Sequence, residues 1–366
     1  MDFDFKSVLA AFGMDVGKAE VSRYGTGHIN DTFSVAFPEN RLVLQRLNSS
    51  VFPNPAGVMD NICSVTEFMK GRIEARGGEV SRETLNFIKS VNGPAYYIDS
   101  SGNFWRMMQF VSGSTCSETA ESNEMLEKCG QAFGRFIGDL IDFPAETLVE
   151  VIPDFHNTPE RVRQLKESVN MNRSGRLSNV TEEVRFALDR EYDASELIRL
   201  ENDGKLPLRV THNDTKMSNI LLDKKTGEVL CVIDLDTVMP GLAAYDFGDS
   251  IRSGATCAAE DEKDPDKVKF SMERFSAYAK GFLKSAGKLL TSEELFSLPV
   301  GAKLMTYECG IRFLADYLNG DVYFRTDYPD HNLVRARNQF ILVREMERNM
   351  DSMHSVISQI MEEINS

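Results

Sequence analysis

The chain lacks the features that mark several protein classes. Its 366 residues contain one tryptophan and five histidines, and the six cysteines are scattered without a CxxC pair. This pattern argues against a zinc ribbon or a dense disulfide framework, and reduced thiols are expected. Lys and Arg number 41 against 56 Asp and Glu, which gives a formal net charge of −15. Without a basic surplus the chain is not expected to bind nucleic acid.

Long hydrophobic runs are also missing from the sequence. No uninterrupted apolar segment approaches the roughly 18 residues that a membrane-spanning helix needs. The opening MDFDFKSVLAAFGM carries acidic residues where a secretory signal would be basic. We therefore expect a cytoplasmic protein with no membrane partner. Its acidity does not exclude ATP as a ligand, because metal ions and backbone amides can neutralise the phosphates.

The first part of the chain is typical of a small sheet. Residues 21–47 alternate in polarity and are interrupted by GTGHIND and PEN, which predicts strands joined by turns. Residues 58–76 carry apolar side chains at helical spacing. AYYIDSSGNFWRMMQFV predicts two further strands, and the polar SGSTCSE after it suits a hinge or linker. We expect an N-terminal nucleotide-binding lobe over residues 1–111.

From about residue 119 the apolar spacing becomes helical. Further helices are predicted over 158–170, 181–200, 266–286, 292–318 and 332–364. A chain of this length exceeds the usual size of a single core. The prediction is therefore an α+β, two-lobed fold, with a small antiparallel-sheet lobe and a larger, mainly helical C-terminal lobe over residues 112–366.

One stretch of the second lobe carries a spaced set of polar residues. RVTHNDTKMSNILLD places His212, Asp214 and Asn219 between two apolar strands, and Asp234 ends the strand VLCVID fifteen residues after Asn219. A kinase catalytic loop needs this set: Asp214 accepts the hydroxyl proton of the acceptor, and Asn219 and Asp234 bind the Mg²⁺ that bridges the phosphates of ATP. His212 is expected to hold the loop by hydrogen bonds. Loop Asp and Asn residues are often mere turn formers, but the order of strand, loop, hairpin and Asp favours the kinase.

Longer strings carry a more specific likeness. THNDTKMSNILLD, CVIDLDTVMPG, YDFGDSIRSGA, AEDEKD and ECGIRFLADYLNGD resemble bacterial N-acetylhexosamine 1-kinases. These enzymes belong to the aminoglycoside-phosphotransferase-like, or choline kinase-like, branch of the protein-kinase fold. The similarity covers nearly the whole chain, from GHIND near the start to YPDHNLVRAR near the end. The Asp–Asn–Asp set is shared by the superfamily, so the sugar assignment depends on the longer strings.

The resemblance implies a sugar kinase that transfers the γ-phosphoryl group of ATP to the C1 hydroxyl of N-acetylglucosamine or N-acetylgalactosamine. It makes Asp214 the general base, and Asn219 and Asp234 the Mg²⁺ ligands. Around the sugar it places His28, Asn30, Thr237, Arg312 and Tyr323.

Each sugar assignment has a plainer alternative. His28 could only stabilise a turn, and Thr237 could cap a helix or bond to the backbone. Arg312 lies four residues from both Glu308 and Asp316, so a solvated stripe of ion pairs competes with a sugar role. The apolar surroundings of Arg312 in IRFLADYL favour the sugar role, because a guanidinium beside an apolar face usually has a specific acceptor.

The sequence departs from protein kinases on the third strand. A protein kinase carries a lysine there that contacts the α- and β-phosphates. The matching strand RLVLQRL has Gln45, and alternation turns Arg46 to the opposite face. Gln45 can donate a hydrogen bond to the nucleotide but brings no charge. We therefore predict that Lys216, two residues after the base, supplies the positive charge to the γ-phosphate; the alternative is a solvated loop lysine.

Three further segments are assigned more simply. Gly25 and Gly27 of YGTGHIND are expected to cover the phosphates at a hairpin tip, and Gln109 and Val111 of MMQFV to offer backbone groups to adenine. Asp236 is a weaker metal-ligand candidate. DFGD at 246–249 is assigned a structural role without metal.

Two other functions stay open at this point. The same fold could phosphorylate choline, homoserine, methylthioribose or an aminoglycoside. A choline site needs an aromatic cage, to which the single Trp105 adds little, whereas acidic groups for an aminoglycoside are plentiful. Loss of the strand lysine also suggests a non-catalytic pseudokinase scaffold, against which the intact Asp214, Asn219 and Asp234 argue.

Overall fold

The computed structural model describes residues 3–25, 29–117 and 119–366. The chain forms two compact units, each made of three segments. The first unit comprises Met1–Cys116, Asp142–Ile152 and Ile220–Pro240, and the second comprises Ser117–Ile141, Pro153–Asn219 and Gly241–Ser366. The predicted boundary near residue 111, which divides the chain by a single cut, stays a prediction.

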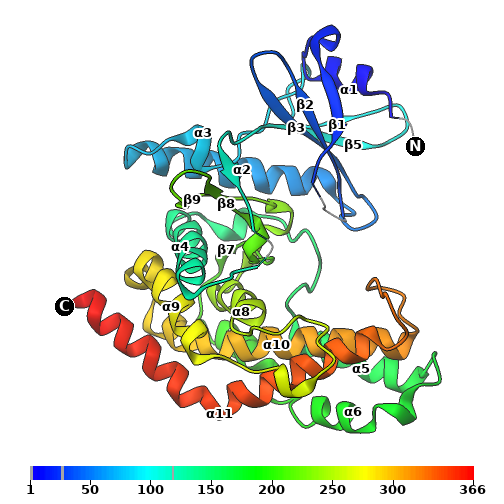
Figure 1. Cartoon of the computed structure of the whole chain (residues 1–366), viewed down its shortest axis with the longest axis vertical. Coiled ribbons are helices and arrows are strands. Elements are labelled where there is room, and N and C mark those ends of the chain that lie inside the picture. Colours follow the sequence, from blue (N-terminus) through cyan, green and yellow to red (C-terminus); the bar gives the residue numbers. More distant parts are fainter. Residues whose placement is uncertain (1–2, 26–28, 118) are drawn as a thin grey trace. The chain divides into compact units, whose positions relative to one another are not determined.

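The first unit is built on a five-stranded antiparallel sheet, visible in Figure 1, with the order β1-β2-β3-β5-β4. In chain order its strands are β1 (Glu20–Arg23), β2 (Asp31–Ala36), β3 (Arg41–Leu47), β4 (Tyr97–Ile98) and β5 (Phe104–Gln109). The register sets Gln45 opposite Thr32 on one side and opposite Arg106 on the other. Leu44, Trp105 and Met107 are fully buried on one face.

A short helix that the sequence analysis did not predict covers that face. α1 (Phe5–Ala11) begins at Asp4, whose carboxylate accepts a hydrogen bond from Ser7 N–H at 3.1 Å. Val8 and Leu9 of this helix are buried in the core of the sheet. The capping carboxylate explains where the helix starts.

The remaining part of the first unit consists of two helices and a small sheet. α2 (Pro55–Ala75) follows the Asn54 cap and confirms the helix predicted over 58–76. α3 (Val80–Glu83) follows it. The small sheet has the order β6-β8-β9, formed by β6 (Ser114–Thr115), β8 (Ile220–Asp223) and β9 (Val229–Val232). The segment predicted as a linker thus contains a strand, because Ser114 and Thr115 pair with Asp223 and Leu222 of β8.

The second unit is mainly helical (Figure 1). Its helices are α4 (Asn123–Asp139), α5 (Thr158–Met171), α6 (Thr181–Leu188), α7 (Glu196–Asn202), α8 (Ala243–Gly254), α9 (Met272–Ala286), α10 (Ser292–Asn319) and α11 (His331–Asn365). α4 and α9 pack closely at glycines: a Cβ atom at Gly281 would lie 1.8 Å from the carbonyl oxygen of Glu127. The buried side chains of α10 form the centre of the core of this unit.

Two helix predictions were wrong in detail. The helix predicted over 181–200 is interrupted between α6 and α7, where Arg190 N–H and Glu191 N–H bond to carbonyls three residues back. Such tighter turns end an α-helix. The helix predicted from residue 266 starts at Met272, because the Ser271 hydroxyl caps it by accepting a bond from Arg274 N–H at 3.3 Å.

The fold class is confirmed: an antiparallel sheet in the N-terminal part and a mainly helical remainder. Each of the six cysteines is a free thiol. No helix in the part of the chain that the structure describes is long and apolar enough to cross a membrane.

Candidate active site

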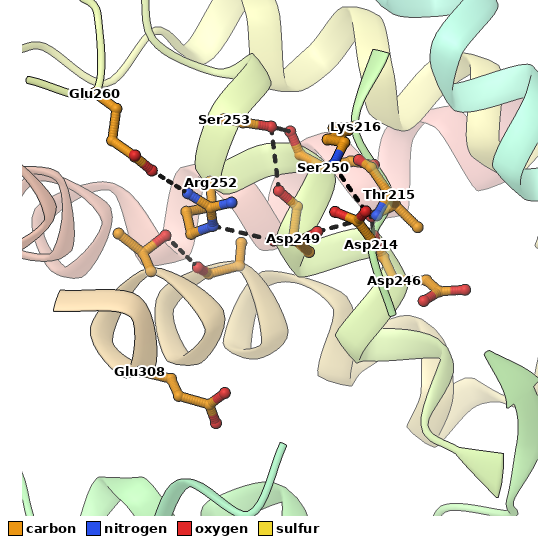
Figure 2. Close-up of polar contacts among 12 residues, drawn as sticks. Asp214, Thr215, Lys216, Asp246, Asp249, Ser250, Arg252, Ser253, Glu260 and Glu308 are labelled. Carbon is orange, nitrogen blue, oxygen red and sulfur yellow. Dashed lines mark hydrogen bonds and ion pairs between the residues drawn. The ribbon is translucent and has the colours of Figure 1, made fainter. Parts of the chain in front are cut away.

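The loop predicted to be catalytic runs from β7 (Arg209–Thr211) to η5, a 3-10 turn over Met217–Asn219. Asp214 Oδ2 accepts hydrogen bonds from Lys216 Nζ at 2.8 Å and from Asn219 Nδ2 at 3.0 Å. Asn219 is buried, Asp214 is half-buried, and Lys216 is exposed. The structure thus brings the proposed base, the proposed cation and one proposed metal ligand into a single cluster (Figure 2 shows Asp214 with Lys216).

The backbone of this loop is fixed by α8. The fully buried carboxylate of Asp246 accepts hydrogen bonds from His212 N–H and Asn213 N–H, each at 2.8 Å. Thr215 N–H donates to Asp249 at 3.0 Å, and the Thr215 hydroxyl donates to the Asp246 carbonyl oxygen at 2.7 Å. DFGD is therefore a structural anchor of the loop. Sequence analysis assigned DFGD a structural role without metal but did not predict that it anchors this loop, which two aspartates on an apolar helix could have suggested.

The two anchoring aspartates have different electrostatics. Burial raises the pKa of Asp246, and this effect outweighs the attraction of His212 and the two backbone N–H groups. Burial also acts on Asp249, but Arg252, whose Nε lies 3.0 Å from the Asp249 carboxylate, helps to hold the pKa of Asp249 below its usual value. Figure 2 shows this pair beside Asp214, Thr215 and Lys216. A carboxylate with its own cation thus supports the segment that carries the base.

His212 has the environment expected of a residue that holds the loop. Its side chain is fully buried, and ring centroids of Phe133 and Phe136 lie 5.5 and 5.8 Å from its own. Its Nδ1 accepts a hydrogen bond from Asp214 N–H at 3.3 Å. The imidazole therefore fixes the backbone at the proposed base.

The proposed metal ligands offer the oxygen atoms that Mg²⁺ prefers. Asn219 uses its amide nitrogen for its bonds to Asp214, so these bonds do not engage its amide oxygen. Asp234, in the first unit, is exposed and has left-handed backbone angles (φ 62°, ψ 55°) just before η6 (Leu235–Thr237). Within the described residues no group of three or more His, Cys, Asp or Glu side chains could hold a metal alone. Mg²⁺ in phosphotransfer sites takes only one or two carboxylates and completes its shell with phosphates and water, so an Asn and an Asp fit it.

Gln45 lies between two partners inside the sheet of the first unit. Its Nε2 donates to Thr32 Oγ1 at 3.0 Å, and its Oε1 accepts a hydrogen bond from Arg106 Nε at 2.9 Å. On the opposite face Arg46 pairs with Asp31 at 2.5 Å, as alternation predicts. Both ends of the Gln45 amide are used within the sheet, and its contact with a nucleotide stays a prediction.

Asn30 and Thr237, proposed near the sugar, also belong to the first unit. Asn30 Nδ2 donates to Asp236 Oδ2 at 2.6 Å, and Asn30 Oδ1 accepts from Asn48 N–H at 3.0 Å. Asp236, the weaker ligand candidate, is buried and pairs with Arg106 at 2.5 Å. Thr237 is half-buried in η6. The sugar roles of Asn30 and Thr237 remain predictions.

The residues proposed to cover the nucleotide are only partly described. Gly25 is exposed with φ 77°, whereas Gly27 and His28 lie outside the described residues. Gln109 is exposed, and its N–H donates to the Asn86 carbonyl oxygen at 2.9 Å. The carbonyl oxygen of buried Val111 accepts from the Ser114 hydroxyl at 2.6 Å. Adenine contacts at Gln109 and Val111 stay predictions.

Arg312 and Tyr323 lie close together in the second unit. The guanidinium carbon of Arg312 lies 5.9 Å from the ring centroid of Tyr323 and 5.5 Å from that of Phe324. Among the described residues no salt bridge joins Arg312 to either neighbouring carboxylate, although the charge of Arg312 helps to lower the pKa of Glu308. Glu308 bonds to His156 and Thr158, and Asp316 accepts three backbone N–H groups, from residues 322–324. Arg312 thus faces aromatic rings, one of which, Tyr323, is 71% exposed.

Arg161 and His156 lie in the same region as Arg312, and all three are close enough to Glu308 to interact with its charge. His156 Nδ1 lies 3.0 Å from the buried Glu308 carboxylate, and His156 Nε2 has no hydrogen-bond partner among the described residues. Arg161 Nε is likewise buried without a partner in that part of the chain. Burial lowers the pKa of Arg161, and the nearby charge of Arg312 acts in the same direction. Sequence analysis did not find His156 or Arg161, because only the tertiary fold brings α5 and the turn before it close to α10.

Comparison with known proteins identifies the family. A model of the APH phosphotransferase enzyme family matches residues 20–265, which is more than half of the chain. The chain belongs to this phosphotransferase family. It is therefore related to kinases of small molecules.

Solved structures agree with this membership at the level of fold. An aminoglycoside phosphotransferase from Alicyclobacillus acidocaldarius matches with a TM-score of 0.56 at 14% identity, covering 100% of this chain and 97% of that one. A choline kinase from Cryptosporidium parvum matches with a TM-score of 0.54 at 16% identity, over 92% of each chain. A spectinomycin phosphotransferase in complex with ADP and spectinomycin matches at 0.56 and 12% identity, over 94% of this chain and 97% of that one. These likenesses confirm the predicted kinase-like fold.

Proposed function

We propose that this phosphotransferase is an N-acetylhexosamine 1-kinase. It transfers the γ-phosphoryl group of ATP to the C1 hydroxyl of N-acetylglucosamine or N-acetylgalactosamine. The hydroxyl oxygen forms the new bond to the γ-phosphorus, the bond from the γ-phosphorus to the bridging oxygen breaks, and ADP leaves. Asp214 accepts the hydroxyl proton, so that N-acetylhexosamine 1-phosphate is released.

The observation that carries phosphotransfer is the cluster of Asp214, Lys216 and Asn219 on an anchored loop. A carboxylate base of this kind acts mainly by orienting the acceptor hydroxyl, and an anomeric hydroxyl suits it because it is more acidic than an ordinary alcohol. Lys216 Nζ is exposed and near the base, so it can stabilise charge that develops on the transferred group. Mg²⁺, held through Asn219 and Asp234, would neutralise the phosphate oxygens of ATP.

The surroundings of Arg312 support a neutral acceptor rich in oxygen atoms. Arg161 and Arg312 are donors, and the Glu308 carboxylate there is already bonded to His156 and Thr158. Hydroxyl and acetamido oxygens can accept bonds from such donors, and an aromatic ring such as Tyr323 can cover an apolar sugar face. A cationic acceptor such as choline or an aminoglycoside would instead meet like charges. This argument favours the sugar over choline and over an aminoglycoside.

A panel of acceptors tests the proposal. ADP release is measured with ATP and Mg²⁺ and with free N-acetylhexosamines, choline, homoserine, methylthioribose and an aminoglycoside. The matched control is the methyl glycoside of N-acetylglucosamine, which keeps the other hydroxyls and blocks only C1. Turnover with the free sugar and none with the glycoside is the expected result. Turnover with both would mean another hydroxyl is the acceptor, and turnover with a different alcohol or with none would overturn the assignment.

A further inference from the structure

A chain of polar contacts, buried at its central ion pair, joins the sheet of the first unit to the turn after β9. Arg106 on β5 donates through Nε to Gln45 of β3 at 2.9 Å and through Nη1 to Asp236 Oδ1 at 2.5 Å. The other oxygen of Asp236 accepts from Asn30 Nδ2 at 2.6 Å. Asp236 thus receives a cation and an amide from the sheet side, and all four residues belong to the same unit.

The central ion pair is deeply buried. The side chains of Arg106 and Asp236 are only 3% and 5% exposed. Removing two charges from water is costly, and a buried pair often gives no more stability than apolar side chains would. The presence of this buried ion pair is therefore better explained by the geometry that it imposes than by added stability. Its net charge is zero, so it does not replace the positive charge of a strand lysine.

The Arg106–Asp236 pair holds in place the turn that contains Asp234 and η6. Asp236 is the second residue of η6, and Asp234, just before η6, has the strained left-handed conformation given above. The same turn is held from a second side, since Asn61 of α2 donates to the Val238 carbonyl oxygen at 2.8 Å. A non-glycine residue keeps such backbone angles only where its surroundings impose them. Arg106 and Asn61 provide these constraints from the sheet and from the helix.

We propose that Arg106 is a positioning residue for metal–nucleotide binding, acting through Asp236 to fix the turn that presents Asp234. This inference rests on the proposed function, because it takes Asp234 as a ligand of nucleotide-bound Mg²⁺. It assigns to a strand arginine and a turn aspartate the joining role that a strand lysine and a helix glutamate fulfil in protein kinases. In this chain position 45 has no charge, and Met59 Sδ of α2 lies 4.0 Å from Arg106 Nη1.

The test compares Arg106→Gln with a matched control on the same sheet. Arg46→Gln removes the arginine that follows Gln45 on β3, whose ion pair lies on the opposite face. Affinity for ADP is measured by calorimetry with and without Mg²⁺. Arg106→Gln is expected to weaken binding of Mg·ADP about tenfold or more and binding of ADP without metal less than about threefold. Arg46→Gln should change neither affinity by more than about twofold.

A second variant guards against simple unfolding, because Arg106→Gln leaves the Asp236 charge buried alone. Arg106→Gln combined with Asp236→Asn removes both charges, and the Asn keeps the size of Asp236, so this variant should fold while retaining the loss in Mg·ADP affinity. Full Mg·ADP affinity in this double variant would overturn the inference. So would equal losses with and without Mg²⁺, since these would indicate a general effect of structure. Wild-type protein that binds no Mg·ADP would overturn the proposed function as well.

Discussion

Each unit contains an ion pair next to a residue with a proposed role in phosphotransfer, and the two pairs differ in exposure. Arg106 and Asp236 in the first unit are 3% and 5% exposed, whereas Lys216 and Asp214 in the second are 46% and 34% exposed. A buried pair holds one geometry, because each charge left alone would be strongly unfavourable. An exposed pair contributes little to stability and can separate easily. The first pair is suited to positioning, and the second to chemistry in which both groups change partners.

The largest expected effect comes from the base. Asp214→Asn should reduce turnover by roughly a hundredfold or more with little change in nucleotide affinity, because it removes the proton acceptor but not a phosphate contact. Steady-state kinetics and calorimetry with ADP measure the two quantities. Asp234→Asn is the matched variant, and it should weaken metal–nucleotide binding as well. Loss of stability in both, with unchanged turnover per folded molecule, would contradict these roles.

The next effect concerns the cation of the exposed pair. Lys216→Ala should lower kcat by about ten- to a thousandfold with a smaller change in the KM for ATP, because it removes charge that stabilises the transition state. Gln45→Ala should do less, since a neutral donor forms a weaker hydrogen bond than a charged one. If Gln45→Ala is the more damaging, the phosphates depend on the sheet and Lys216 is a solvated loop residue.

A smaller effect is expected on stability near Arg312. Burial raises the pKa of Glu308, but His156, Arg312 and the Thr158 hydroxyl together hold that pKa below its ordinary value of 4.5. Ionised Glu308 therefore stabilises the folded state above about pH 4.5, and this contribution is lost as the pH falls through the lower, folded-state pKa. Glu308→Gln should cost about 1–3 kcal/mol of unfolding free energy at pH 7.

The pH dependence is the decisive part of that prediction. The free energy of unfolding of wild type and of Glu308→Gln is measured with denaturant at pH 7 and at about pH 3.5. The difference between the two proteins should be smaller at the lower pH. Glu363→Gln, at an exposed position near the end of α11, is the control and should stay within about 0.5 kcal/mol of wild type at both pH values. A difference that stays constant would mean that the charge of Glu308 is not what stabilises the region.

The smallest expected effect is on stability and concerns the exposed Lys216–Asp214 pair. Lys216→Ala should change the free energy of unfolding by less than about 1 kcal/mol, because both members of the pair are solvated. Thermal or urea unfolding measures this on the same preparation that is used for kinetics. A loss of several kcal/mol would show that Lys216 is a structural residue, and its kinetic effect would then need another explanation.

Much of the fold could be predicted because its elements have strong local signals. α2, α5, α10 and α11 have long apolar periodicity, and α2, α5 and α10 also have capped starts, such as Asn54 at α2 or the Thr291–Glu294 capping box at α10. Short elements were missed or misjudged. β6 has two residues and owes its pairing to β8, far along the chain, and the break between α6 and α7 has no glycine or proline to mark it.

The candidate site was predictable where one segment carries it. Asp214, Lys216 and Asn219 lie within six residues, and the fold brings them together as the motif requires. Arg106 could not be found in this way, since its meaning depends on the register that sets it opposite Gln45 and on a contact with Asp236 across 130 residues. A single arginine within the apolar strand FWRMMQ was the available signal. Arg161 and His156 likewise depend on tertiary packing.

The most direct test of the account is the identity of the product. Phosphorus NMR of the material formed from N-acetylglucosamine, ATP and Mg²⁺ distinguishes a phosphate on C1 from one on another carbon through its coupling to the anomeric proton. The account predicts a sugar 1-phosphate, formed by wild-type protein and reduced by roughly a hundredfold or more with Asp214→Asn. A 6-phosphate, or no sugar phosphate at all, would contradict it.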